Sequence, residues 1–283
     1  MRRRRTTEER HPAGAEEVLI CQGLRKTYSD PLGKRSVTAL DGIDWEIRRG
    51  ERWAVVGRSG SGKTTLGRIL ALDVRPDGGE IQVLGEDPWC LRPAHRRRLR
   101  RSVQWIPQDP ADALDPRFTV ARAAAEPLDL EGGLGARWRG RRPEHREQVV
   151  ATLAQVGLGA DLMDRPVPAL SGGQKRRLVI ARALLAEPRV LVLDESFTGL
   201  DLSLRVQLEA LLRSLHQDLG LTLVSISHDL RTIPRLADRV LVLSAGRVVE
   251  RSTPAALLAT PRHDESRALV AALALASAEG VRG

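Results

Sequence analysis

Short apolar runs recur along this chain, separated by polar and glycine-containing segments. Four of them consist mainly of apolar residues, at positions 53–56, 190–193, 221–226 and 240–243. Runs of this kind are typical of strands that are buried on both faces of a parallel sheet. Between the runs, apolar residues recur at helical spacing, as in residues 66–72. The pattern predicts an α/β fold with a mostly parallel sheet covered by helices.

The N-terminal part shows a different pattern. Residues 37–40 and 43–47 alternate apolar and polar side chains, which indicates antiparallel strands with one face in solvent. Short strands are also expected at residues 18–21 and 80–84. We therefore predict an N-terminal antiparallel β subdomain beside the parallel sheet.

Changes in composition divide the chain into three parts. Residues 1–16 are charged and show no apolar period, so we expect a disordered basic tail. Residues 17–258 contain all the expected strands and form the main domain. Within it, residues from about 110 to 178 are rich in Ala, Arg, Gly and Pro and predict an inserted helical subdomain. Residues 259–283 form a short C-terminal extension.

A glycine-rich motif follows the first apolar run. It fits the phosphate-loop pattern G-x-x-x-x-G-K-[ST], and an expected strand precedes it while an expected helix follows. Its residues, all expected to bind the nucleotide, are Gly57, Arg58, Ser59, Gly60, Ser61, Gly62, Lys63, Thr64 and Thr65. The backbone N–H groups of such a loop surround phosphate oxygens, Lys63 reaches the outer phosphates, and the Thr64 hydroxyl can hold Mg²⁺. The motif predicts a phosphate-loop NTPase core.

Polar residues stand at the ends of other expected strands: Gln108, Asp194, Glu195 and His228. Each has an ordinary alternative explanation, as a strand cap, a loop residue or a surface residue. Ligands of open parallel sheets lie at the carboxyl ends of the strands, so we expect these four side chains around the phosphate loop. There Asp194 can hold the water shell of Mg²⁺ and Glu195 can orient an attacking water.

A second glycine motif carries a family resemblance. Residues 170–174 read Leu-Ser-Gly-Gly-Gln and open an expected helix, between Gln108 and Asp194 in chain order. With this motif in this order, the chain resembles the ATP-binding cassette (ABC) ATPases over roughly residues 18–258. The resemblance implies an ATPase that uses ATP and Mg²⁺. It further implies that the chain pairs head to tail with a second copy, or with a paralogous ATPase, around two ATP molecules.

The resemblance also implies a role for each motif residue. Tyr28 is the adenine-stacking aromatic, although a half-buried structural ring is the alternative for this tyrosine. The implied catalytic residues are Glu195 as general base, His228 as γ-phosphate contact and Gln108 as Mg²⁺ sensor coupled to the membrane partner. The implied metal-site residues are Thr64, Gln108 and Asp194. The residues implied to contact the ATP held by the other copy are Ser171, Gly172, Gly173, Gln174 and Asp201.

A narrower resemblance concerns the segment after Gln108. Residues 108–110 read Gln-Asp-Pro and residues 113–117 read Ala-Leu-Asp-Pro-Arg, similar to ATPases of oligopeptide, dipeptide and nickel importers. Those proteins commonly have Ser and Asn at the positions of Ala113 and Asp115. They also often carry a C-terminal His-Pro-Tyr-Thr-(Arg/Gln)-Ala-Leu run, where this chain has His-Asp-Glu-Ser-Arg-Ala-Leu at 263–269. The resemblance implies import of a peptide or nickel-like solute.

The implied partners follow from that assignment. They are integral membrane permease subunits and, indirectly, an extracellular solute-binding protein. The chain would act at the cytoplasmic face of the cell membrane, as a peripheral subunit. Its two cysteines, Cys21 and Cys90, are far apart, and no secretory signal is visible, which agrees with a reducing compartment. The sequence leaves open the solute and the choice between homodimer and heterodimer.

The charge of the chain raises an alternative function. A net charge of +9 is compatible with an ABC ATPase that acts on ribosomes or nucleic acid without a membrane partner. However, arginine is spread along the whole chain and aromatic residues make up 3%, so no base-stacking surface is evident and no nucleic acid is expected. An unrelated phosphate-loop kinase or GTPase would leave the motif at 170–174 unexplained.

Overall fold

The computed structural model describes residues 16–30, 35–129, 143–197 and 199–279. Residues 1–15 of the expected tail at 1–16 lie outside this part, and so do residues 130–142 of the expected helical subdomain. The strands are β1 (Glu17–Ser29), β2 (Ser36–Arg48), β3 (Arg52–Val56), β4 (Gly78–Val83), β5 (Val103–Ile106), β6 (Val190–Asp194), β7 (Thr222–Ile226), β8 (Arg239–Ser244) and β9 (Arg247–Ser252). The α-helices are α1 (Lys63–Leu70), α2 (Pro93–Ser102), α3 (Val120–Asp129), α4 (Pro143–Gln155), α5 (Gly172–Leu184), α6 (Leu202–Leu219), α7 (Ile233–Leu236), α8 (Pro254–Ala259) and α9 (Asp264–Glu279). Three 3₁₀ turns, η1 (Pro110–Ala113), η4 (Ala160–Leu162) and η5 (Val167–Ala169), complete the described elements.

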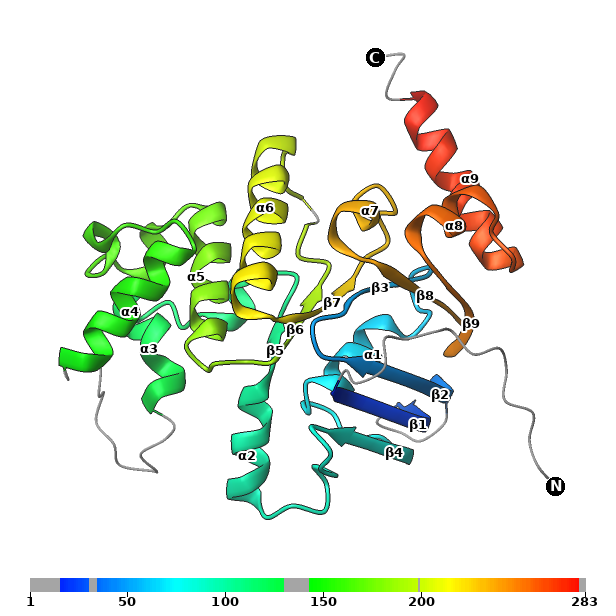
Figure 1. Cartoon of the computed structure of the whole chain (residues 1–283), viewed down its shortest axis with the longest axis horizontal. Helices are drawn as coiled ribbons and strands as arrows, with labels where there is room; N and C mark the ends of the chain where they lie inside the picture. The colour runs from blue at the N-terminus through cyan, green and yellow to red at the C-terminus, as the bar shows by residue number, and fades with distance from the viewer. Residues whose placement is uncertain (1–15, 31–34, 130–142, 198, 280–283) are drawn as a thin grey trace.

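The larger sheet has the strand order β5-β6-β7-β3-β8-β9 within the described residues. All neighbours up to β8 pair in parallel, and every residue of β6 and β7 is buried. This confirms the α/β fold with a mostly parallel sheet. One strand was not expected from the sequence: β9 pairs antiparallel with β8 at the sheet edge, after a turn at Ala245 and Gly246. In Figure 1, β3 lies inside the sheet, with α1 directly after it in the chain.

The smaller sheet has the order β2-β1-β4 and is antiparallel, as expected. Its strands are longer than the sequence indicated, because β1 continues past residue 21 to Ser29 and β2 is one strand across both alternating segments. The pairing of β1 with β2 shifts register at several points. Gly23 and Gly42 adopt left-handed φ values of 59° and 79° near these shifts. Such bulges interrupt the two-residue alternation, which explains why the pattern looked like shorter pieces.

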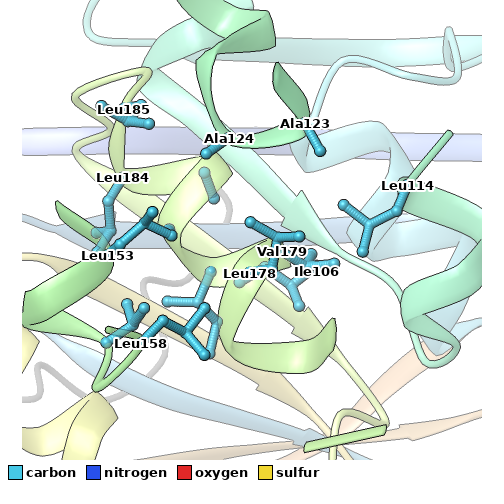
Figure 2. Close-up of a cluster of buried hydrophobic side chains, with 14 of the residues drawn as sticks. Ile106, Leu114, Ala123, Ala124, Leu153, Leu158, Leu178, Val179, Leu184 and Leu185 are labelled. Atoms are coloured by element: carbon cyan, nitrogen blue, oxygen red, sulfur yellow. The ribbon is translucent and has the colours of Figure 1, made fainter. Parts of the chain in front are cut away.

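Helices α3, α4 and α5 pack together and contribute to one apolar core that reaches β5 and β6. Figure 2 shows its side chains converging: Ala123 and Ala124 come from α3, Leu153 from α4, and Leu178 and Leu184 from α5. Alanines on α3 let the helices approach closely, and leucines fill the space between them. Helix α5, which begins at the second glycine motif and is called the signature helix below, is therefore fixed on the edge of the parallel sheet through this core.

The C-terminal residues form two helices, α8 and α9, on the side of the molecule away from α3 and α4 (Figure 1). Leu269, Val270 and Leu273 of α9 pack against a separate core formed by residues such as Ala54 of β3 and Val240 of β8. The extension therefore packs against the same apolar core as the strand that leads into the phosphate loop. None of the helices in the described ranges is long and apolar enough to cross a membrane.

Candidate functional site

The loop between β3 and α1 fits so tightly that side chains are excluded at two of its glycines. A Cβ on Gly57, with φ 153°, would lie 2.2 Å from the carbonyl oxygen of Leu243. A Cβ on Gly62, with φ 101°, would lie 2.3 Å from the carbonyl oxygen of Ala39. Backbone atoms cannot move aside cheaply, so only glycine is tolerated at either position. The loop is thus held between β8 and β2, with its N–H groups at the start of α1.

Lys63 is buried at the first position of α1. Its Nζ donates to the carbonyl oxygens of Gly57 and Arg58, both at 2.8 Å. Burial lowers the pKa of Lys63, while the nearby carboxylates of Glu195, Asp194 and Glu265 raise it. The ammonium group therefore lies inside the loop, where its positive charge would attract an anionic phosphate.

Asp194 ends β6 opposite Thr64 of α1. The Thr64 hydroxyl donates to Oδ1 of Asp194 at 3.4 Å. Burial and the neighbouring Glu195 raise the pKa of Asp194 from its usual 3.8 to about 6. A hydroxyl and a buried carboxylate are oxygen ligands that suit Mg²⁺, and a cation there would offset the cost of burying the charge. Thr64 and Asp194 therefore fit the metal role expected of them.

Glu195 and His228 come together at the ends of adjacent strands β6 and β7. Nδ1 of His228 lies 3.0 Å from Oε1 of Glu195. The backbone of Glu195 has a φ of 42°, in the left-handed region, while its N–H donates to the carbonyl oxygen of Ile226 at 2.9 Å. A non-glycine residue in this region is strained, and such strain is common at functional sites. The turn directs the carboxylate of Glu195 toward His228.

Gln108 and Tyr28 lie at the periphery of this arrangement. The Gln108 side chain is exposed, and no hydrogen bond within the described residues joins it to Thr64 or Asp194. Tyr28 is 42% exposed near the end of β1, with Nζ of Lys26 at 5.5 Å from its ring centroid. The structure thus assembles Lys63, Thr64, Asp194, Glu195 and His228, while the metal role of Gln108 and the stacking role of Tyr28 stay predictions.

The second glycine motif and Asp201 each cap a helix. Ser171 and Gln174 make a capping box at the start of α5, with the Ser171 N–H donating to Oε1 of Gln174 at 2.9 Å. Asp201 caps α6 by accepting from the Leu204 N–H at 2.8 Å. A Cβ on Gly173 would meet Leu204 at 3.3 Å, so the two helix starts are neighbours. Within the described chain, no hydrogen bond or ion pair joins these residues to the loop at 57–65, and their contact with the ATP of a second copy stays a prediction.

Several arginines connect these parts, and no local sequence pattern marks them. Nη1 of Arg205 in α6 lies 3.2 Å from Oδ2 of Asp229, the residue after His228. From α5, Arg176 donates to the carbonyl oxygen of Gln108 at 3.1 Å, and Arg182 donates to that of Ala113 at 2.9 Å. Burial lowers the pKa of Arg176 and nearby Asp109 raises it. The segment after Gln108 is therefore held by the signature helix.

A phosphate loop beside a strand-end carboxylate pair is typical of phosphate-loop NTPases. The family model described as "ABC transporter" matches residues 40–198, more than half of the chain, so this protein belongs to the ABC transporter family and is an ATPase. This confirms the family resemblance of the sequence.

Relatives and solved structures agree with that assignment. The chain is 41% identical over 258 residues to a putative peptide import ATP-binding protein of Brucella ovis, covering 90% of this chain and 78% of that protein. It is 39% identical over 261 residues to the dipeptide transport ATP-binding protein DppF of Escherichia coli, covering 91% of this chain and 76% of that protein.

Among solved structures, it is similar to cbiO1 from Clostridium perfringens, part of an ABC transporter complex, with a TM-score of 0.73, 30% identity and coverage of 87% and 92%. It is also similar to the ATP-binding cassette MJ0796, solved as a dimer in a post-hydrolysis state with ADP and Pi. That match has a TM-score of 0.73, 25% identity and coverage of 83% and 98%.

Proposed function

We propose that this protein is the ATP-binding and ATP-hydrolysing subunit of an importer that takes up peptides or a nickel-like solute through partner permeases. The observation that carries the proposal is the similarity, over 90% of the chain, to peptide import ATP-binding proteins. The dipeptide transport relative supports the same solute class. The alternative, an ABC ATPase acting on ribosomes or nucleic acid, has no support among these relatives.

The geometry supports a separate role for each residue of the site. In this proposal Lys63 and the loop N–H groups bind the outer phosphates of ATP, while Thr64 and Asp194, with Gln108, would hold Mg²⁺, which supplies charge neutralisation on the phosphates. Glu195 accepts a proton from the attacking water as general base. His228, at 3.0 Å from Glu195, orients that carboxylate and contacts the γ-phosphate.

The same proposal includes a head-to-tail pair of ATPases. Ser171 stands at the N-terminus of α5, where the helix dipole and free N–H groups favour an anion. In the pair, residues 171–174 and Asp201 of one copy contact the ATP of the other. The dimeric cassette among the similar solved structures supports this arrangement. The partner is a second copy or a paralogue.

The segment 108–117 is the proposed contact with the permeases. It is held by Arg176 and Arg182 of α5, so a movement of the signature helix would be transmitted to it. At its end Arg117 is bound to Asp115, with Nη2 to Oδ2 at 2.6 Å, and the arginine side chain is exposed. The protein would therefore work as a peripheral subunit on the cytoplasmic face, below a permease pair that receives a solute-binding protein outside.

Purification from membranes tests this function. A tagged full-length chain, extracted with its native neighbours in mild detergent, should bring down two integral membrane proteins, identified by mass spectrometry. In the purified complex Arg117→Glu should reduce permease-linked stimulation of ATP hydrolysis and leave basal hydrolysis intact. Arg146→Glu, an exposed charge reversal on α4, should change neither and serves as control. Recovery of ribosomes without membrane proteins would overturn the proposal.

A further inference from the structure

The phosphate loop makes an ion pair with the C-terminal extension. Nε of Arg58 lies 3.2 Å from Oε1 of Glu265, in the first turn of α9. Arg58 directly follows Gly57, and the carbonyl oxygens of both residues accept hydrogen bonds from Nζ of Lys63. The partner of Arg58 is thus a carboxylate from a segment 207 positions further along the chain, which the proposed reaction does not use.

The two ends of this pair differ in how firmly they are held. The Glu265 side chain is 14% exposed and the Arg58 side chain is 66% exposed. The adjoining Ser266 is fully buried. Before them, the N–H groups of Arg262 and His263 both donate to Oε2 of buried Glu250 in β9, each at 3.0 Å. Glu265 therefore has a fixed place, and the long arginine side chain adapts to it.

The charges of the pair bear on anion binding. Glu265 is close enough to Lys63 to oppose the lowering of its pKa by burial. A carboxylate near a phosphate site repels the phosphate, and one that pairs with Arg58 also neutralises a cation on the loop. Asp264, the neighbouring acid, contacts Arg267 of its own helix. The two adjacent carboxylates thus differ in direction: that of Glu265 faces the phosphate loop, and that of Asp264 contacts a residue of its own helix.

We propose that Glu265 is a positioning residue that connects the C-terminal helix α9 to the nucleotide site: it holds the Arg58 guanidinium toward α9 and thereby weakens triphosphate binding. The inference rests on the phosphate loop binding ATP, as proposed above. Because coupling between two sites is reciprocal, a bound triphosphate that draws Arg58 to itself loosens the first turn of α9. The extension is then a sensor of nucleotide on the loop.

Titration of the full chain with a non-hydrolysable ATP analogue and Mg²⁺, followed by calorimetry, tests the inference. Glu265→Gln should lower the dissociation constant about three- to tenfold at moderate salt, and less at high salt. Asp264→Asn removes the same charge one residue away and should leave the constant unchanged. In an Arg58→Gln background, Glu265→Gln should have a clearly smaller effect, since the carboxylate acts through Arg58.

A second measurement separates positioning from simple structural support. Hydrogen exchange over residues 262–270 should become faster in the wild type when the analogue binds, and should not respond in Arg58→Gln. Unchanged affinity in Glu265→Gln, with normal binding by the wild type, would overturn this inference alone. An equal effect of Glu265→Gln in both backgrounds would overturn the role of Arg58. A wild type that does not bind the analogue would overturn the proposed nucleotide function as well.

Discussion

Nδ1 of His228 lies 3.0 Å from Oε1 of Glu195, although 33 positions separate the two residues in the chain. The contact exists because β6 and β7 are parallel neighbours, so that their carboxyl ends meet at one edge of the sheet. The strained turn at Glu195, with φ 42°, completes it. The proposed general base is therefore already held in place by the imidazole.

Glu195→Gln should keep ATP and Mg²⁺ binding and lose hydrolysis. Glutamine has nearly the same shape as glutamate but cannot accept the proton of the attacking water, so the hydrolysis rate should fall by about 10² to 10⁴. The trapped ATP should hold the two copies together, and size-exclusion chromatography with Mg-ATP should show a dimer. If the chain pairs with a paralogous ATPase, that paralogue is added to the sample before chromatography.

A second substitution provides the control for that dimer. Ser171→Arg places bulk and charge at the start of α5, in the proposed contact with the ATP of the other copy, so the double variant should elute as a monomer. The hydrogen bond that the Gln174 N–H donates to Oγ of Ser171 is lost too, and circular dichroism should establish that α5 stays folded. Hydrolysis at the wild-type rate in Glu195→Gln would refute the assignment of the base.

Lys63→Ala should abolish tight ATP binding. The substitution removes the buried ammonium group beside the loop carbonyls of Gly57 and Arg58 and leaves those carbonyls without its two hydrogen bonds. Fluorescence titration with a labelled ATP measures the loss. Arg97→Ala, an exposed cation on α2, serves as control for the change in net charge. Retained affinity in Lys63→Ala would show that the loop is not the nucleotide site.

Asp194→Asn should stabilise the free protein at high pH. The pKa of Asp194 is raised from 3.8 to about 6 in the folded state, so the folded protein holds a proton that the unfolded chain releases between these values. Stability of the wild type therefore falls as the pH rises through that window. Asparagine does not titrate. The free energy of unfolding of the variant should therefore exceed that of the wild type by at most roughly 3 kcal/mol above pH 6 and by little below pH 4.

Thermal unfolding at several pH values measures this gain. Asp161→Asn, an exposed substitution in η4, removes a carboxylate outside the site and serves as the control. With Mg-ATP present the wild type should be more stable than Asp194→Asn, because Asp194 then contributes to nucleotide binding and stabilises the wild type. A gain of equal size at all pH values would contradict the raised pKa of Asp194.

Arg205→Ala should slow hydrolysis with little effect on ATP affinity. The Arg205–Asp229 ion pair, at 3.2 Å, joins α6, which Asp201 caps, to the loop that carries His228. Without it the loop gains freedom and the His228–Glu195 contact is less well populated, so kcat should fall several-fold. Arg213→Ala, on the same helix but in contact with the Arg235 carbonyl, is the control. An unchanged kcat would remove Arg205 from the catalytic arrangement.

The sequence predicted the parallel strands, the phosphate loop and its strand-end partners, because short-range patterns specify them. It did not predict β9, whose residues 247–252 include Arg247, Glu250 and Arg251 in an edge strand of no clear period. It also missed the Arg58–Glu265 and Arg205–Asp229 pairs. In a chain with 45 basic and 36 acidic residues, the fold alone determines which of them meet.

The place of β3 in the sheet has a consequence for how the protein is made. Both neighbours of β3 lie far downstream: Val55 pairs in register with Ile226 of β7 and with Leu241 of β8. When the phosphate loop has emerged from the ribosome, more than 150 residues must therefore still be synthesised before β3 has a partner strand. Until then β3 is an apolar strand with two open edges, which favours misassociation. Nascent chains that stop before β7 should aggregate and lack nucleotide binding. The phosphate loop should take its final conformation only after β7 and β8 have been synthesised.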